Sequence, residues 1–222
     1  MVERNKYFDI LKGIAILGVV AVHYAQLYPF EINSKIRNFF ISGQYLVQMF
    51  FVISGYFVFL SFSNHNYTFM KFIKSKIISL IPICYISYFI TVVLFLFTSR
   101  QIQFFDLLFA FSFTNGFSPH FINSIGGWYI GTLVVFYICT PFLFKIITNQ
   151  KRAIVLFLLA LLFCLVSDFL LRQFYDTGWF FYFWLPRQFP AISLGILLFY
   201  IRKSLNENNS YQTIYKGGDI YV

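Results

Sequence analysis

The chain has 222 residues, of which 59% are hydrophobic, 23% aromatic and only 11% charged, and its mean hydropathy is +0.71. A soluble domain usually carries about 25% charged residues, so this composition excludes an ordinary soluble enzyme, a disordered tail and a collagenous chain. The net charge of +9 would suggest nucleic-acid binding in a soluble protein. Here Lys and Arg stand mostly between apolar blocks, so we expect no nucleic-acid partner and interpret them as topology signals. The composition predicts an all-α polytopic bundle of transmembrane helices in a lipid bilayer.

Six stretches of the chain are long and apolar enough to form transmembrane helices. A helix that crosses the bilayer needs about 20 mostly apolar residues. We predict spans at Gly13–Phe30, Ser42–Phe62, Ile77–Thr98, Gly127–Ile147, Ala153–Leu171 and Trp179–Ile201. A seventh stretch, Phe104–Ser118, is shorter and is interrupted by Asn115, Gly116 and Pro119.

The distribution of cations decides whether this seventh stretch crosses the membrane. If it does not cross, 12 of the 17 Lys and Arg residues lie on one side, and the other five are Lys35, Arg37, Arg100, Arg172 and Arg187. If it does cross, that bias largely disappears. Because cytoplasmic loops carry an excess of Lys and Arg, we predict six spans, with a cytoplasmic N-terminus and Phe104–Gly126 as an outer or re-entrant segment.

The polar residues after the last predicted span form a separate region. We divide the chain into a membrane-embedded domain, 1–203, and a polar tail, 204–222, which is rich in Asn and has no helical hydrophobic period. We expect this tail to be solvated in the cytoplasm. Cys84, Cys139 and Cys164 lie inside apolar blocks without the spacing of metal ligands, so we expect small buried hydrophobes and no metal site.

The first predicted span carries the clearest candidate for chemistry. His23 is ionisable, and such residues are costly to bury in a bilayer, which makes them functional candidates. Lys12 precedes it by eleven residues, which is about 20° more than three helical turns and about 16 Å along the axis. The two are therefore predicted to share one helix face, with His23 at mid-membrane depth and Asp9 one turn before Lys12, within reach of an ion pair. The alternative is that His23 only hydrogen-bonds a neighbouring helix and Lys12 only anchors the topology.

Other charged residues stand at the end of the fifth predicted span and after it. Asp168 and Arg172 are four residues apart, and we expect them to form an ion pair at the outer membrane surface. Arg187 follows Pro186 and either faces a cavity or reaches toward the membrane surface.

The segment Asp9–Leu17, together with Val22 and His23, resembles the opening of the acyltransferase type 3 family. That family comprises bacterial multi-pass proteins that O-acylate surface and secreted glycans, and its signature is an Arg, ten residues and a His. Lys12 occupies the Arg position here, and the spacing is kept. Further segments resemble family blocks in the same order: Gln48–Tyr56, Phe72–Lys76 leading to Pro82, Trp128–Pro141, and a looser fit at Pro190–Leu198.

The resemblance implies a membrane-bound O-acyltransferase of the bacterial inner membrane. Such an enzyme would move an acyl group, acetyl as the simplest case, from acyl-CoA to a sugar hydroxyl of a surface polysaccharide or lipid-linked glycan. The resemblance further implies that Lys74 and Lys76 bind the phosphates of acetyl-CoA, with Lys12 nearby and held by Asp9. His23 would accept the hydroxyl proton, since histidine exchanges protons near neutral pH.

Departures from the family pattern keep two alternatives open. Lys12 keeps the charge of the signature Arg but lacks its bidentate fork, and Leu133 stands where many members carry a Glu. Family members usually have more spans than are predicted here, so the sequence also fits an inactive, shortened member. A third class is a small transporter of glycan or acyl intermediates, in which Lys12 and His23 line a pathway; broken helices would favour it, and the six predicted spans contain none.

Overall fold

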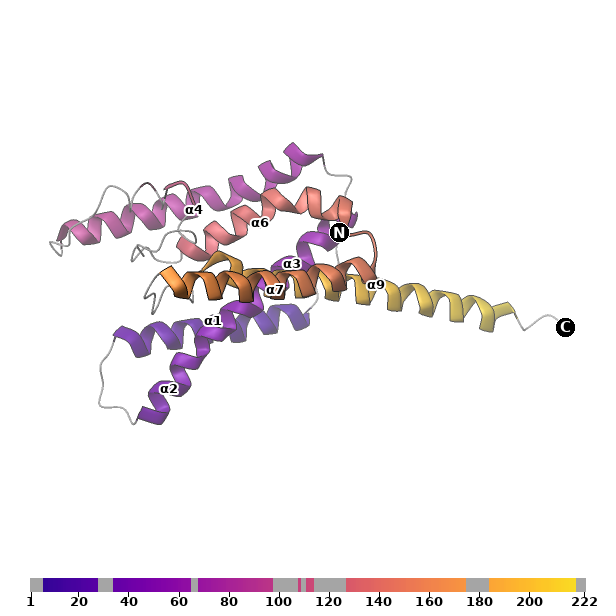
Figure 1. The fold of residues 1–222 in the computed structure, drawn as a ribbon, viewed down its shortest axis with the longest axis horizontal. Coiled ribbons are helices and arrows are strands. Elements are labelled where there is room, and N and C mark those ends of the chain that lie inside the picture. Colours follow the sequence, from indigo (N-terminus) through magenta and orange to yellow (C-terminus); the bar gives the residue numbers. More distant parts are fainter. Residues whose placement is uncertain are drawn as a thin grey trace.

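The computed structural model describes residues 6–27, 34–64, 68–97, 108, 111–113, 127–174 and 184–218, and these are almost entirely helical. The elements are α1 (Lys6–Leu27), α2 (Ser34–Ser42), η1 (Gly43–Tyr45), α3 (Leu46–Asn64), α4 (Phe69–Phe97), α6 (Gly127–Ile146), α7 (Gln150–Phe174), η3 (Leu185–Gln188) and α9 (Phe189–Gly218). Figure 1 shows an elongated bundle in which α1, α4, α6, α7 and α9 run roughly along the long axis, while α2 and α3 cross it obliquely. The part of the chain that is described contains no strand, which confirms the predicted all-α class.

Among the described residues, five helical stretches are long and apolar enough to cross a membrane: Lys6–Ala25, Lys35–Asn64, Phe69–Leu94, Trp128–Ile146 and Gln150–Phe174. They correspond to the first five predicted spans. The sixth predicted span begins at Trp179, outside the described residues, and its described part consists of η3 and the start of α9. The segment Phe104–Gly126 also lies mostly outside the described residues, so the prediction made for it stays open.

Several helices begin before, or end after, the apolar stretches that predicted them. α1 begins at Lys6, so the charged residues Asp9 and Lys12 are already helical. α9 runs on to Gly218, and it leaves the bundle as a single helix toward the C-terminus (Figure 1). Hydropathy locates the apolar part of a helix, whereas backbone hydrogen bonding continues into polar residues that can face water or headgroups.

Side-chain contacts fix the relative directions of the helices around α3. Phe8 of α1 contacts Tyr56 and Phe57, whereas Gly18, further along α1, lies against Leu46 at the start of α3, so the two helices run antiparallel. Contacts of α3 with η3 and then α9 advance along both segments together, from the Gln48–Gln188 pair to the ring contact of Phe59 with Tyr200. α9 therefore runs parallel to α3, as helices separated by an even number of membrane crossings must.

Glycines bring the backbones of α3 and α9 into direct contact. A Cβ atom on Gly55 would lie 2.2 Å from the carbonyl oxygen of Ile192, and one on Gly195 would lie 2.0 Å from that of Val52. Small residues of this kind allow close approach of membrane helices, where van der Waals packing rather than the hydrophobic effect drives association. The crossing of α3 with α9 is the centre of the bundle.

An aromatic core extends from this crossing toward α6 and α4. Phe51, Phe59, Phe72, Phe136 and Ile196 are among its buried members. Phe51 contacts Tyr129 of α6, and Phe62 of α3 contacts Phe72 near the start of α4. The high aromatic content of the sequence thus fills the interior of the bundle.

The far side of the bundle is closed by α7, which packs on α9. Phe163 stacks on Phe189, and the hydroxyl of Tyr200 donates to the carbonyl of Ile147 at the turn before α7. The outer face of α7 exposes large apolar side chains, among them Leu158, Leu162 and Leu165. Such a face is suited to lipid rather than water.

Candidate active site

α1 is an uninterrupted helix from Lys6 to Leu27, and it carries the two residues that the sequence singled out. Lys12 and His23 are eleven residues apart, so a continuous helix places them about 20° apart around its axis. The packed sector of α1, formed by Ala15, Val22 and Ala25, is buried against its neighbours and is centred about 100° around the helix from Lys12 and His23. Lys12 and His23 therefore flank the packed face of α1 rather than lie within it.

Lys12 is held at the junction with α3 by an aromatic ring. Its ammonium nitrogen lies 5.1 Å from the centroid of the Phe57 ring, within the range of a cation–π interaction. Phe57 in turn contacts Phe8, whose ring also stacks on Tyr56 at 5.2 Å. Lys12 is only half-buried, so it can still meet an anion.

A second cation lies on the other side of this aromatic group. Arg202 of α9 donates from Nη1 to the hydroxyl of Tyr56 at 2.5 Å, and Tyr56 is 4% exposed. Tyr56 and Phe57 are neighbours in α3, so Lys12 and Arg202 flank one aromatic group formed by Phe8, Tyr56 and Phe57. Sequence reasoning counted Arg202 only as a topology signal, because its partner Tyr56 is 146 positions away and no local spacing reveals such a pair.

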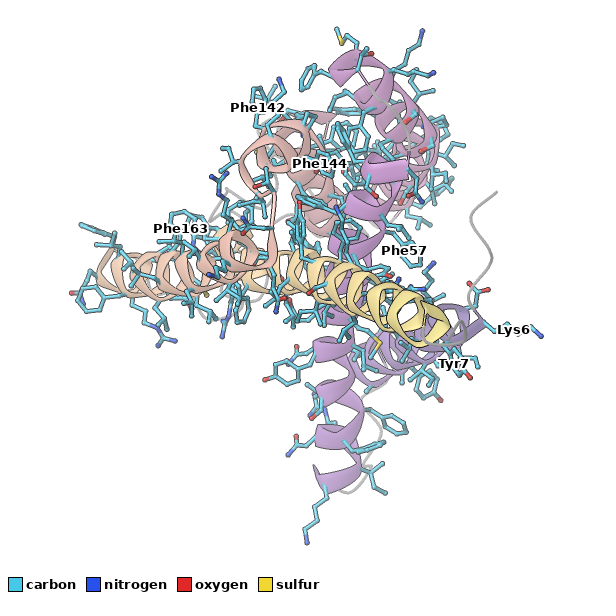
Figure 2. All side chains as sticks on the ribbon, turned by 90° about the vertical axis from the view of Figure 1, so that its right-hand side faces the viewer. Lys6, Tyr7, Phe57, Phe142, Phe144 and Phe163 are labelled. Atoms are coloured by element: carbon cyan, nitrogen blue, oxygen red, sulfur yellow. The ribbon has the colours of Figure 1, made fainter. Side chains whose placement is uncertain are left out.

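This group lies at the end of the bundle where α1 begins. In Figure 1 the start of α1, the start of α4 and the projecting end of α9 all lie at the right. Figure 2 looks from that side and labels Lys6, Tyr7 and Phe57 there, together with Phe142 and Phe144 near the end of α6.

His23 lies toward the opposite end of α1. The imidazole is exposed in the described structure, and His23 stands two residues before the end of the candidate span Lys6–Ala25. The expectation of mid-membrane depth stays a prediction, and α1 begins seven residues before the apolar stretch that defined this span. Asp9 is half-buried and stands one helical turn before Lys12.

Lys12, Arg202 and the three rings between them are called here the Lys12 group. The structure does not bring Lys74 and Lys76 to this group. Both lie in the first two turns of α4, where Lys74 is exposed and Lys76 is half-buried. α4 packs on α6 and, through Phe72, on Phe62 of α3. Figures 1 and 2 both draw α4 at the top of the bundle and α1 well below it.

One stripe of α3 links the Lys12 group to α6. Phe50, Ser54 and Phe57 follow at four and three residues and therefore share one helix face. Ser54 is hydrogen-bonded to Tyr129 of α6, and the ring of Phe50 lies 6.3 Å from that of Tyr129. All three stripe residues are half-buried, and the sequence alone did not single out Ser54 or Tyr129 as partners.

Asp168 forms an ion pair that sequence spacing did not predict. Its Oδ2 atom lies 3.9 Å from Nε of Arg187, which η3 presents to α7. Arg187 is the principal cation acting on the Asp168 carboxylate, and the expected partner Arg172 is the second. Residues four apart on one helix are neighbours, but here the ion-pair partner of Asp168 comes from η3, which is distant in the sequence.

Comparison with known proteins assigns this architecture to a family. A family model described as an acyltransferase domain matches residues 5–215, and hence all the described helices except the last turn of α9. No curated protein and no solved structure matches the chain significantly. The match includes α1 with Lys12 and His23 as well as α9 with Arg202, so it extends well beyond the segment up to Pro141 that carried the resemblance. The chain belongs to the acyltransferase type 3 family and is a membrane acyltransferase.

Proposed function

We propose that the protein transfers an acyl group, acetyl as the simplest case, from acyl-CoA to a hydroxyl of a surface polysaccharide or lipid-linked glycan. The observation that carries this proposal is the arrangement of α1. One helix face holds a cation, Lys12, near one end of the bundle and an exposed imidazole, His23, toward the other. A reaction between a cytoplasmic donor and an acceptor from the other side of the membrane needs a cation that binds the donor at one end and a base toward the other end.

The donor phosphates are assigned to the end where α1 begins. Coenzyme A carries several phosphate charges, and charge-assisted hydrogen bonds from Lys and Arg are the usual way to hold them. Lys12 and Arg202 flank the Phe8–Tyr56–Phe57 group and could each meet a different phosphate. Lys74 and Lys76 form a separate pair of cations on α4. They would contact the donor only if bound acyl-CoA extended across the face of α3.

The transfer step needs a base at the other end of α1. His23 would accept the proton of the acceptor hydroxyl while its oxygen forms a bond to the thioester carbonyl. The carbon–sulfur bond then breaks, the coenzyme leaves as thiolate, and the imidazolium returns the proton to the sulfur. Coenzyme A carries its thioester at the end of a long pantetheine arm, so phosphates near Lys12 are compatible with an acyl group near His23.

The location proposed for the protein is the bacterial inner membrane, with the N-terminus in the cytoplasm. Support comes from the excess of cations on the side where α1 begins and from the parallel course of α3 and α9. In this orientation Lys12 and Arg202 face the compartment that holds acyl-CoA.

The proposal is tested with membranes that contain the 222-residue chain, radiolabelled acetyl-CoA and glycan from the host cell. We expect label to appear in the glycan in proportion to the amount of protein, and an excess of unlabelled acetyl-CoA to suppress it. Membranes from cells lacking the protein are the control. Absence of label from glycan, with a protein shown to be folded and inserted, would contradict the proposal.

A further inference from the structure

A group of polar side chains lies where η3 meets α3 and α7, beyond Lys12 along the bundle. It consists of Gln48, Asp168, Arg187 and Gln188 and is called here the η3 site. Gln48 Nε2 donates to Gln188 Oε1 at 2.7 Å, and Arg187 faces Asp168. η3 thus directs Gln188 toward α3 and Arg187 toward α7, and the four side chains come from three elements.

The Asp168 carboxylate is incompletely satisfied. Its side chain is 18% exposed, and only its Oδ2 atom faces Arg187. Among the residues that the structure describes, none donates a hydrogen bond to Oδ1, which is buried. A buried acceptor without a donor is costly, and an ionisable residue within a membrane span is a functional candidate by default.

The η3 site lies beyond Lys12 along the bundle, between the levels of Lys12 and His23. The contact between Lys12 and Phe57 provides a common reference point. Gln48 stands nine residues before Phe57 and His23 eleven residues after Lys12. Gly18 of α1 lies against Leu46, two residues before Gln48, so His23 lies roughly 10 Å further along α1 than the level of Gln48. Because α1 and α3 are antiparallel, both displacements point toward the same end of the bundle.

We propose that the η3 site binds the acceptor as a hydroxyl-rich ligand, that is, a sugar unit of the glycan. A sugar hydroxyl can donate to Asp168 Oδ1, while Arg187 and the amides of Gln48 and Gln188 can donate to sugar oxygens. Carboxylate, guanidinium and amide groups together match a ligand that presents many alternating donors and acceptors. The inference rests on the proposed function, which supplies the acceptor, and it assigns these residues to binding rather than to the transfer step.

Binding is tested separately from transfer by using the His23→Ala protein in nanodiscs. The probe is a set of oligosaccharides released from the host's surface polysaccharide, and tryptophan fluorescence reports binding because Trp184 directly precedes η3. We expect Asp168→Asn to weaken binding about tenfold, since a hydrogen bond to a charged group is removed. Ser167→Ala is the matched control, because the Ser167 hydroxyl donates to Cys164 within the same helix turn.

A purely structural role of the ion pair is distinguished by exchanging the charges. The double variant Asp168→Arg with Arg187→Asp can re-form an ion pair between α7 and η3. The carboxylate then lies on η3 instead of α7. We expect the exchanged protein to regain thermal stability but not oligosaccharide binding. Wild-type affinity in Asp168→Asn, full binding by the exchanged protein, or no binding by the His23→Ala parent would overturn the proposal. Binding that depends on Asp168, together with no acyl transfer by the wild-type protein, would uphold the η3 site and reject the proposed function.

Discussion

At the scale of single residues, two cations from different helices meet one aromatic group. Lys12 reaches it through the face of Phe57, and Arg202 reaches it through the hydroxyl of Tyr56. The two interactions differ in kind: the first needs only a positive charge near a ring, whereas the second needs a directed donor. The consequences of substitution should therefore differ at the two positions.

Lys12→Arg should retain acyl transfer within a few-fold, because the charge and the cation–π contact survive. Lys12→Gln should lower kcat/KM about tenfold, the effect of losing one charged contact. Lys6→Gln is the control, an exposed lysine of the same helix. Equal activity of Lys12→Gln and Lys6→Gln would show that Lys12 serves only as a topology anchor.

Arg202→Gln should raise the KM for acetyl-CoA about tenfold, since a charge-assisted contact to a phosphate is lost, while kcat changes little. Lys203→Gln removes the neighbouring exposed cation and should leave the KM within about two-fold of wild type if one directed contact dominates. A KM for acetyl-CoA that responds equally to both substitutions would indicate a general effect of charge near the membrane instead of a site at Arg202.

At the scale of elements, the crossing of α3 with α9 holds both halves of the site in place. The same crossing positions Tyr56 beside Arg202 and Gln48 beside Gln188. The sequence predicted the apolar extent of the helices well, because hydropathy depends on composition alone. It could not predict which helices touch: Gly55 and Gly195 meet across the bundle, and neither stands in a local pattern that names the other as its partner.

Gly195→Ala should destabilise the protein, because the new methyl group would lie 2.0 Å from the Val52 carbonyl oxygen and would force the two helices apart. We expect a loss of about 1–3 kcal/mol in the free energy of unfolding, measured by denaturation in detergent. Gly13→Ala, whose added Cβ meets nothing within 4 Å, should be neutral or stabilising by up to about 1 kcal/mol. A Gly195→Ala protein as stable as Gly13→Ala would contradict the close crossing.

At the scale of the whole molecule, the contacts between side chains show that successive long helices alternate in direction. The start of α1 and the projecting end of α9 lie at one end of the bundle (Figure 1), as the distribution of cations predicted. The sequence placed Lys12 and His23 correctly on one helix, because a single helix has a fixed period. It grouped Lys74 and Lys76 with Lys12, whereas the fold carries α4 away from α1, and linear order alone does not determine such lateral positions.

Topology can be measured with single cysteines in a chain from which Cys84, Cys139 and Cys164 have been replaced by Ala. A cysteine at Lys35 should react with a membrane-impermeant maleimide in intact spheroplasts. Cysteines at Lys6, Asn64 and Asn149 should react only after lysis, because the proposed orientation places these ends of α1, α3 and α7 in the cytoplasm. Labelling of Asn149 in intact spheroplasts would show that the region between α4 and α6 crosses the membrane.

The most direct test of the central claim, that one face of α1 carries the transfer reaction, is the rate of acetyl transfer from acetyl-CoA to glycan by His23→Ala. Loss of a general base should reduce this rate about a hundredfold or more, at unchanged protein level and with coenzyme A binding intact. His65→Ala, the same substitution at another histidine of the chain, should transfer at the wild-type rate. An unchanged rate in His23→Ala would contradict the account and require the base to be sought on another helix.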